Sequence, residues 1–375
     1  MKASRILILA AAAALVGGAP ALAFHDGGVA ACNGCHTMHN SQNGQPMNFN
    51  AMGTGPGTAV GTGYTDLLLF ENKSDVCLRC HAGEGRYRIW SVSPSAPSPV
   101  NANRGGGDFV FLQEDNINDG HGGATNPILG YASGHSVISG IKGTMVDPVN
   151  TVAPGGTFLA ADLACTSCHD PHGTGSYRLL YQSGQNVDTA FYTATIDAEG
   201  ISLGTAPETP ANHNAYHSGY SAWCATCHGE FHQGSGRMIH PSGQSLGAEV
   251  ATNYNFYNGT SDCIANPPSG LQPCGSGVPG SAYLPEVPFE DAGTTLSSTT
   301  GPSSSSQVAC MSCHRAHATS ARDAGRWDFS IPGLAEDGHE SGSYAIPNPY
   351  DGYQRSLCNK CHSQDEFDEP VDFTP

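Results

Sequence analysis

Long runs of apolar residues are scarce in this sequence, and the clearest one lies near the N-terminus. It covers residues 6–16, follows two basic residues, and gives way to small residues that end in Ala21-Leu22-Ala23. A basic start, a short apolar stretch and an Ala-x-Ala end are typical of a secretory signal peptide. We therefore predict that residues 1–23 are a signal peptide and that residues 24–375 form the mature protein, outside the cytoplasm.

The same apolar run is too short to cross a bilayer, because a membrane-spanning helix needs about 20 apolar residues. No other stretch of the sequence is long and apolar enough to do so. The sequence therefore predicts no transmembrane segment.

Beyond the signal peptide, the sequence predicts little regular structure. It contains 48 Gly and 25 Pro among 375 residues, and the interiors of helices and strands exclude both residue types. Residues 55–63, 91–107 and 293–306 are rich in Gly, Ser, Thr or Pro and are predicted loops. Residues 191–196 are predicted to pair as short strands. A loop-rich chain buries little apolar surface of its own, so something else must supply the core.

Twelve of the fourteen cysteines fall into six copies of the pattern Cys-x-x-Cys-His. This pattern is the attachment signature of c-type haem. Its two cysteines can both form thioethers with the vinyl groups of one porphyrin, and the adjacent histidine then lies under the iron as proximal ligand. The cysteines are Cys32, Cys35, Cys77, Cys80, Cys165, Cys168, Cys224, Cys227, Cys310, Cys313, Cys358 and Cys361. The proximal histidines are His36, His81, His169, His228, His314 and His362, so the sequence predicts six covalently attached haem c groups.

Other uses of paired cysteines fit less well. Zinc ribbons do not require a histidine directly after every second cysteine, and a thioredoxin-like redox pair needs a βαβ context that the sequence does not indicate. Structural disulfides would not give six pairs with identical spacing. The two remaining cysteines, Cys263 and Cys274, bracket a turn-rich loop. We predict a disulfide between them, worth about 3 kcal/mol; a functional thiol is the lesser alternative.

Eleven histidines lie outside the motifs, enough to give each of six irons a second histidine ligand. The candidate distal ligands are His25, His39, His135, His172, His232, His240 and His317. His121, His213, His217 and His339 are interpreted as surface residues or partners of haem propionates. Methionine is the competing type of ligand, but no methionine of the sequence is favoured by its position.

Four candidate ligands lie close behind a motif. His39, His172 and His317 each follow a proximal histidine by three residues, and His232 follows one by four. On a short helical turn, such a pair lies on one side of the helix, so the two histidines cannot bind opposite faces of one iron. We therefore predict that the second histidine of each pair ligates a different haem.

The spacing of the motifs bears on the organisation of the chain. The intervals between them are unequal, so the sequence does not indicate a regular repeat array. We predict one continuous domain over residues 24–375, in which a row of haem groups serves as the hydrophobic core. The predicted fold class is a multihaem c-type cytochrome that is mostly coil, with a short helix at each motif and few short strands.

The charge of the chain bears on the kinds of molecule that it can bind. The chain has 15 basic and 33 acidic residues, and its net charge of −18 becomes −20 without the two basic residues of the signal peptide. An acidic chain disfavours nucleic acid and anionic membrane surfaces as partners.

At its haem motifs, the sequence resembles the filament-forming hexahaem outer-surface cytochromes of metal-reducing bacteria, the cytochrome nanowires. The matching stretches are Phe24-His-Asp-Gly-Gly-Val-Ala30, Cys32-Asn-Gly-Cys-His-Thr-Met-His-Asn40, Gly134-His135, Cys165-Thr-Ser-Cys-His-Asp-Pro-His-Gly173, Trp223-Cys-Ala-Thr-Cys-His228 with His232, His240-Pro241, Cys310-Met-Ser-Cys-His-Arg-Ala-His-Ala318 and Leu357-Cys-Asn-Lys-Cys-His362. The number and order of the motifs agree, whereas the intervening loops lie outside the match.

The resemblance implies an electron carrier at the outer surface of the cell or outside it, rather than an enzyme. It implies closely stacked haem groups, each held by two histidines, that pass electrons to extracellular acceptors such as metal oxides or to other multihaem cytochromes. It also implies head-to-tail homopolymers in which His39 ligates a haem of the next subunit.

Two other functions stay open at this point. A monomeric electron shuttle, periplasmic or associated with the outer membrane, would carry the same motifs. A multihaem reductase needs an iron with an open position for its substrate. Such enzymes mark this iron by a lysine in place of the motif histidine or by a shortage of ligands, and the sequence shows neither.

Overall fold

The fold is described from a computed structural model of the chain. The structure describes residues 32–83, 87–92, 105–113, 129–187, 192–204, 206, 208–232, 242–256, 279–327, 329, 357 and 360–361. The predicted signal peptide and the predicted Cys263–Cys274 disulfide lie outside the described residues.

Short helices are connected by long irregular segments. The α-helices are α2 (Lys73–His81), α4 (Tyr220–Cys224), α5 (Gly247–Phe256) and α6 (Cys310–Cys313). Short turns of 3-10 helix lie at Cys32–Gly34, Thr65–Leu67, Phe109–Gln113, Gly130–Ala132, Ala160–Asp162, Cys165–Ser167, Tyr177–Leu179, Gly229–Phe231, Pro279–Ser281 and Arg322–Ala324. The described chain is mostly coil, which confirms the prediction from its Gly and Pro content. No helix in this part of the chain is long and apolar enough to cross a membrane.

The strands form two small antiparallel ribbons. Strand β1 (Asn186–Val187) pairs with β2 (Tyr192–Thr193), and β3 (Glu199–Ile201) pairs with β4 (Ala215–Ser218) with an irregularity after Glu199. The stretch that the sequence predicts to be a strand, residues 191–196, thus contains β2. Neither ribbon is long enough to form a layer that other elements could cover.

Buried polar side chains form hydrogen bonds that hold irregular segments in place. Asp75 in the first turn of α2 is almost fully buried, and its carboxylate accepts hydrogen bonds from the Ser139 hydroxyl and from the N–H groups of Gly140 and Ile141. Burial raises the pKa of this carboxyl, and the hydrogen bonds lower it in part. Because a buried carboxylate without partners would be costly, these contacts fix the segment 139–141 against the helix of the second motif.

Apolar side chains form separate clusters beside the motifs. One cluster contains Leu78, Trp90, Phe109 and Val137, and another contains the aromatic rings around Tyr254. Motif cysteines border three of the clusters, and these cysteines are Cys313 and Cys361, Cys168, and Cys227. The apolar clusters therefore surround the motifs instead of meeting in one protein core.

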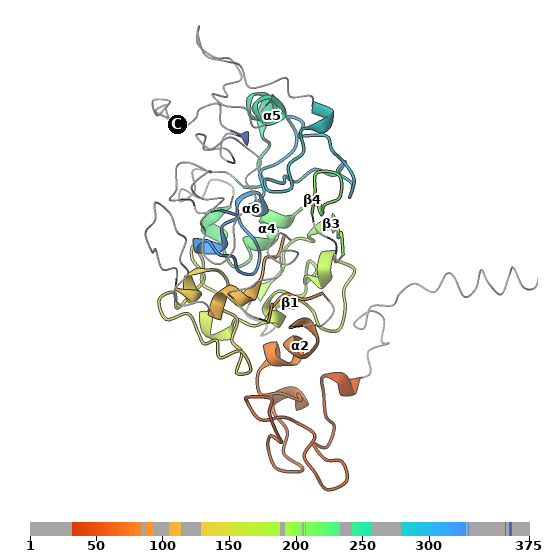
Figure 1. The fold of residues 1–375 in the computed structure, drawn as a ribbon, viewed down its shortest axis with the longest axis vertical. Coiled ribbons are helices and arrows are strands. Elements are labelled where there is room, and N and C mark those ends of the chain that lie inside the picture. Colours follow the sequence, from red (N-terminus) through yellow and green to blue (C-terminus); the bar gives the residue numbers. More distant parts are fainter. Residues whose placement is uncertain are drawn as a thin grey trace, which may run out of the picture.

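The two ends of the molecule differ. Figure 1 shows residues 32–70 as a lobe at one end, followed by α2, whereas α5 lies at the opposite end. Within the lobe, Phe49 and Phe70 stack with their ring centres 4.8 Å apart, and the guanidinium of Arg79 in α2 lies 4.6 Å from the centre of the Phe49 ring. These contacts attach the lobe, which carries the first motif, to the helix of the second.

One glycine packs directly on the fourth motif. A Cβ atom at position 156 would lie 1.7 Å from the carbonyl oxygen of Cys227, closer than any side chain can approach. The carbonyl of the preceding Gly155 accepts the N–H of Glu230 at 2.8 Å, so this loop is held tightly against the motif. Only glycine fits at position 156.

We predict that Gly156→Ala lowers the free energy of unfolding by about 1–3 kcal/mol or more, because the new methyl group must displace the backbone of Cys227. Denaturant unfolding of the purified protein measures the change. Gly280→Ala is the matched control, since nothing lies within 4 Å of a Cβ at that position, and it should change stability by less than about 0.5 kcal/mol. Equal stability of the two variants would contradict the close packing at Gly156.

Candidate functional site

A cavity of about 3640 Å³ connects the motifs. The second cysteine of every motif lines it, and these residues are Cys35, Cys80, Cys168, Cys227, Cys313 and Cys361. A pocket for one drug-sized ligand or cofactor holds about 300–1,000 Å³. The cavity therefore has room for several large groups placed next to one another.

Short helices carry the described motifs, as predicted. The helical segments are Cys32–Gly34, α2, Cys165–Ser167, α4 and α6. Of the sixth motif, only Lys360 and Cys361 are described, and Cys358 and His362 lie outside the described residues. All the described motif cysteines except the exposed Cys32 line the cavity.

The path of the chain after the motif differs from the prediction. In the first, third and fifth motifs, the chain leaves the helix at the proximal histidine. His36, His169 and His314 each form an isolated β-bridge to a later segment, and the backbone at His314 is extended, with φ −113° and ψ 160°. The premise that these motifs place both histidines on one helical turn is therefore wrong. The extended chain carries the second histidine away from the first.

Histidine rings from distant parts of the sequence face each other along the cavity. In each of three pairs, a proximal histidine meets a candidate distal histidine. The pairs are His36 with His172, His169 with His317, and His228 with His135. In this order, the ring centres are 6.4, 6.4 and 5.9 Å apart, and the ring planes are inclined by 8°, 64° and 47°.

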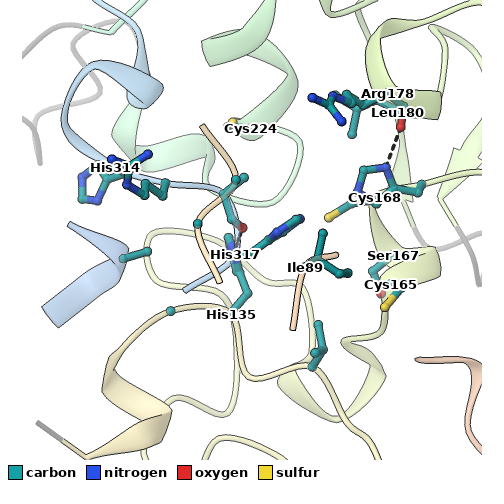
Figure 2. A pocket seen from close by; sticks show the side chains of 18 of the residues that line it. Ile89, His135, Cys165, Ser167, Cys168, Arg178, Leu180, Cys224, His314 and His317 are labelled. Carbon is teal, nitrogen blue, oxygen red and sulfur yellow. Dashed lines mark hydrogen bonds between the residues drawn. The ribbon is translucent and has the colours of Figure 1, made fainter. Parts of the chain in front are cut away.

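These separations are those of two rings that share one metal ion. A bond from a metal to an imidazole nitrogen is about 2.0 Å long, and the ring centre lies about 1.1 Å beyond the nitrogen. Two imidazoles on opposite sides of one ion therefore have their centres about 6 Å apart. Figure 2 shows His135 and His317 close together in the pocket, between His314 on one side and Cys168 on the other.

Burial keeps two of these rings neutral. Burial, followed by the nearby His228, lowers the pKa of His135 to about 4. Burial, followed by the nearby His169, lowers the pKa of His317 to about 3. At neutral pH both imidazoles therefore keep a free nitrogen lone pair, which a metal ligand requires.

Backbone carbonyls hold the ligand rings in place. The Nδ1 of a ring donates to a carbonyl oxygen at 2.7–2.8 Å in five cases. These contacts are His36 to Asp66, His135 to Ala316, His169 to Arg178, His228 to Pro154 and His314 to Asp323. Such a bond fixes the tautomer with hydrogen on Nδ1 and leaves Nε2 free to coordinate.

The first, third and fifth motifs share one supporting turn. In each, the carbonyl that accepts from the proximal histidine opens a pair of left-handed, non-glycine residues. The pairs are Asp66-Leu67, Arg178-Leu179 and Asp323-Ala324, with φ between 53° and 61°. The N–H that follows the proximal histidine then donates to the second carbonyl of the pair. The three motifs are therefore copies of one structural unit.

Neighbouring motifs meet through their cysteines in two alternating ways. The second cysteines approach each other in motifs one and two, Cys35 and Cys80, and again in motifs three and four, Cys168 and Cys227. The first cysteines contact each other in motifs two and three, and again in motifs four and five. The motifs therefore follow one another in space in the order of the sequence.

A serine supports each junction of the second kind. Ser74 in α2 accepts the N–H of Cys165 at 3.4 Å, and Ser221 in α4 accepts the N–H of Cys310 at 3.1 Å. The Ser221 hydroxyl also lies 3.3 Å from the buried carboxylate of Glu290, to which it donates. Each serine lies three residues before the first cysteine of its own motif and ties it to the next one.

The remaining candidate ligands are placed differently. His39 is exposed on the lobe, and Nδ1 of His232 lies 3.4 Å from the Ser242 hydroxyl. His25 and His240 lie outside the described residues. His213 is fully buried, with both ring nitrogens on backbone carbonyls, and Nε2 of His217 lies 2.8 Å from the Thr294 carbonyl.

The residues fit covalently attached haem. Pairs of thiols on short helices, opposed imidazole rings with the spacing of one metal ion, and a large cavity between them form the donor set that this group needs. Burial raises the pKa of Cys168 to about 12 and that of Cys227 to about 11. Among the described residues, no group of three or more His, Cys, Asp or Glu side chains is placed to hold a metal ion by itself, as a structural zinc site of four ligands would require.

Comparison with known proteins supports this interpretation. No model of a known protein family matches the chain. The C-type cytochrome OmcS of Geobacter sulfurreducens is 30% identical to it, over 97% of this chain and 100% of that protein. The chain belongs to the OmcS family of c-type cytochromes.

Solved structures of this family have the same fold. Two of them come from Geobacter sulfurreducens: the cryo-EM structure of the OmcS nanowires and the structure of the outer membrane cytochrome S filament. Both match this chain with a TM-score of 0.72 and 29% sequence identity. Each match covers 91% of this chain and 100% of the other. The predicted resemblance to filament-forming cytochromes is thus confirmed.

The supporting turns were not predicted from the sequence of this family member. A signal for them exists, because the left-handed pair begins ten residues after the second cysteine in both the third and the fifth motifs, at Arg178 and Asp323. In the first motif the corresponding Asp66 follows Cys35 by 31 residues. Because this connection is longer, the ten-residue spacing is not repeated there.

We predict that Ser221→Ala lowers the free energy of unfolding by about 1–3 kcal/mol, because the Cys310 N–H loses its acceptor at a partly buried junction. Thermal or denaturant unfolding of the haem-loaded protein measures the loss. Ser305→Ala, which removes an exposed hydroxyl, should change stability by less than about 0.5 kcal/mol. If Ser221→Ala were as stable as this control, the serine would not join the two motifs.

Proposed function

We propose that this protein carries electrons outside the cell as the subunit of a head-to-tail filament. Membership of the OmcS family and the likeness to the OmcS nanowires support the proposal. The observation that carries it is the set of opposed histidine pairs, in which a motif histidine and a histidine from a distant part of the sequence meet with the spacing of one metal ion.

In this proposal, the chain binds six haem c groups through its motif cysteines and proximal histidines. Haem iron supplies one-electron chemistry by changing between its ferrous and ferric states. The chain holds five of the candidate ligand rings through the carbonyl contacts of Nδ1, and apolar clusters pack beside the motifs. The cysteine and serine junctions keep neighbouring sites close, so electrons can pass from one site to the next.

The ring pairs assign distal ligands to three sites. His172 would complete the site of the first motif, His317 that of the third, and His135 that of the fourth. The second and sixth motifs would draw their distal ligands from the other candidates, among them His232. With two histidines at every iron, no site is open to a substrate, so we propose an electron carrier and not a reductase.

A rule connects the motifs that carry a second histidine. His172 of the third motif faces the site of the first, and His317 of the fifth faces the site of the third. By the same rule, His39 of the first motif should reach the fifth motif of another subunit. Among the described residues, the ring of His314 in the fifth motif has an aromatic neighbour, Phe329, but no histidine opposite it. We therefore assign His39 as the distal ligand of the neighbouring subunit's His314 site.

The lobe offers a surface for this contact. His39 is exposed on it, and so are Met38, Met52, Val60 and Leu67, with 79%, 60%, 47% and 47% of their surface accessible. Exposed apolar side chains lose contact with water when two subunits associate, which favours association. A monomeric shuttle, the alternative function, would leave both this surface and His39 without a partner.

We predict that His172→Ala keeps all six haem groups but converts one low-spin site to high-spin, because the iron at His36 loses its second imidazole. Mass spectrometry should show six haem additions on a chain that starts at Phe24, and electron paramagnetic resonance should show the new signal. His217→Ala, which removes a half-buried histidine from the Thr294 carbonyl, should stay low-spin throughout. An unchanged spectrum in His172→Ala would show that His172 is not the distal ligand of the His36 site.

We predict that His39→Ala abolishes or strongly shortens the filaments while haem content is retained, because the coordination bond between subunits is lost. Electron microscopy of the purified protein measures filament length, and His217→Ala serves again as control. Added to wild-type subunits, the variant should also shorten filaments in proportion to its share, since it can accept a neighbour's His39 but cannot donate its own. Normal filaments of His39→Ala would exclude this role, and a wild-type protein that is monomeric in all conditions would favour the shuttle.

A further inference from the structure

The opposed ring pairs differ in geometry. The planes of His36 and His172 are within 8° of parallel, whereas those of His169 and His317 are inclined by 64°. The distance between ring centres is 6.4 Å in both pairs. The two pairs therefore differ in the angle between their ring planes and not in their separation.

The ring of His317 differs from five of the other candidate ligand rings in how it is held. In the five rings described above, Nδ1 donates to a backbone carbonyl. The Nδ1 of His317 is buried without a hydrogen bond of normal geometry, although the backbone of Gly107 is near. A carbonyl bond of normal geometry therefore does not fix the rotation of this ring, and packing against its neighbours can set it.

The ring of Phe109 stacks on the imidazole of His317. The ring of Phe109 lies parallel to that of His317 within 20°, with 4.4 Å between the ring centres. Trp90 supports Phe109 from a distance of 5.8 Å, and its Nε1 donates to the side chain of Gln113 at 2.8 Å. Phe109 and Trp90 are both buried, with at most 3% of their surface exposed.

A glycine closes the space around the imidazole. A Cβ atom at Gly106 would lie 3.0 Å from both Cε1 and Nδ1 of His317, and the N–H of His317 donates to the Gly106 carbonyl at 2.7 Å. The imidazole is thus held between a backbone segment without side chain and a fixed aromatic ring. It cannot rotate without leaving the face of Phe109 or pressing on the backbone.

We propose that Phe109 is a positioning residue: it holds the ring of His317 at a steep angle to that of His169 and so makes this iron site electronically distinct. The inference rests on the proposed function, because it takes the two histidines as ligands of one haem iron. It adds a specific role for an aromatic residue that is not itself a ligand.

The angle matters because each imidazole interacts with the iron d orbitals through its π system, and this interaction depends on the orientation of the ring plane. Two parallel rings favour the same d orbital and separate its energy from that of its partner. Two rings at a steep angle favour different orbitals, so the energies stay close together. Low-spin ferric iron then gives a rhombic resonance for parallel rings and a strongly anisotropic one, with a larger highest g value, for inclined rings.

The test uses electron paramagnetic resonance of the oxidised, haem-loaded protein. His317→Ala first identifies the strongly anisotropic signal that belongs to this site, because that signal should disappear. Phe109→Leu, which keeps apolar volume but removes the flat ring, should shift the highest g value of the same signal toward the rhombic class. Phe111→Leu is the matched control: Phe111 belongs to the same 3-10 turn and apolar cluster and is equally buried, and the variant should leave the signal in place.

The outcomes separate the two proposals. If His317→Ala removes no low-spin signal, the ligand pair is wrong and the proposed function loses that assignment. If His317→Ala removes the signal but Phe109→Leu leaves it unmoved, only the positioning role fails. A high-spin signal in Phe109→Leu would also overturn it, because Phe109 would then be needed for ligation itself. If Phe109→Leu cannot be obtained as haem-loaded protein, Gly106→Ala is tested instead. Its new methyl group presses on the imidazole and must shift the same signal; an unshifted signal in this variant would overturn the proposal.

Discussion

The opposition of two histidine rings from different motifs is the contact on which the rest of this structure depends. His36 and His172 are 136 residues apart in the sequence, and His169 and His317 are 148 apart, yet each pair lies 6.4 Å from centre to centre. The entropy cost of closing a loop grows slowly with its length, so a strong contact at the ends tolerates connections of any size. This explains how a chain rich in Gly and Pro, with apolar clusters only beside its motifs, keeps one geometry while the spacing between motifs varies.

Placing these rings costs conformational free energy in the supporting turns. A non-glycine residue in the left-handed region costs about 1–3 kcal/mol, and three turns each contain two such residues in succession. Each turn aims its first carbonyl at the Nδ1 of a proximal histidine and bonds the next N–H of the motif with its second. The strain is thus located where a ring must keep a fixed tautomer and a free Nε2. The Nδ1 of His317 has no such bond of normal geometry, and the face of Phe109 packs against its ring.

Much of the site could be predicted from the sequence, because the Cys-x-x-Cys-His pattern contains the chemistry of attachment in five residues. The short helices at the motifs, the prevalence of coil and the strand at Tyr192–Thr193 follow equally from local preferences. Which distal histidine meets which motif could not be predicted, since that depends on the path of long loops. The helical-turn argument failed for His36, His169 and His314 because the chain turns extended at the proximal histidine. The repeat of the supporting turn at all three motifs is not visible in the sequence, because the first motif is joined to its turn by a longer connection than the third and fifth.

The proposed filament needs no interaction that the subunit does not already contain. Within one chain, a second histidine reaches back to an earlier motif of the same kind, from the fifth to the third and from the third to the first. Repeating that step beyond the first motif requires another molecule, and a head-to-tail contact of this sort grows without closing. The chain is strongly acidic, with a net charge of −18, so its copies repel one another, but at physiological salt this repulsion is screened beyond about 8 Å. A coordination bond acts within bonding distance and in one direction. It can therefore fix the order of subunits where their net charge opposes association.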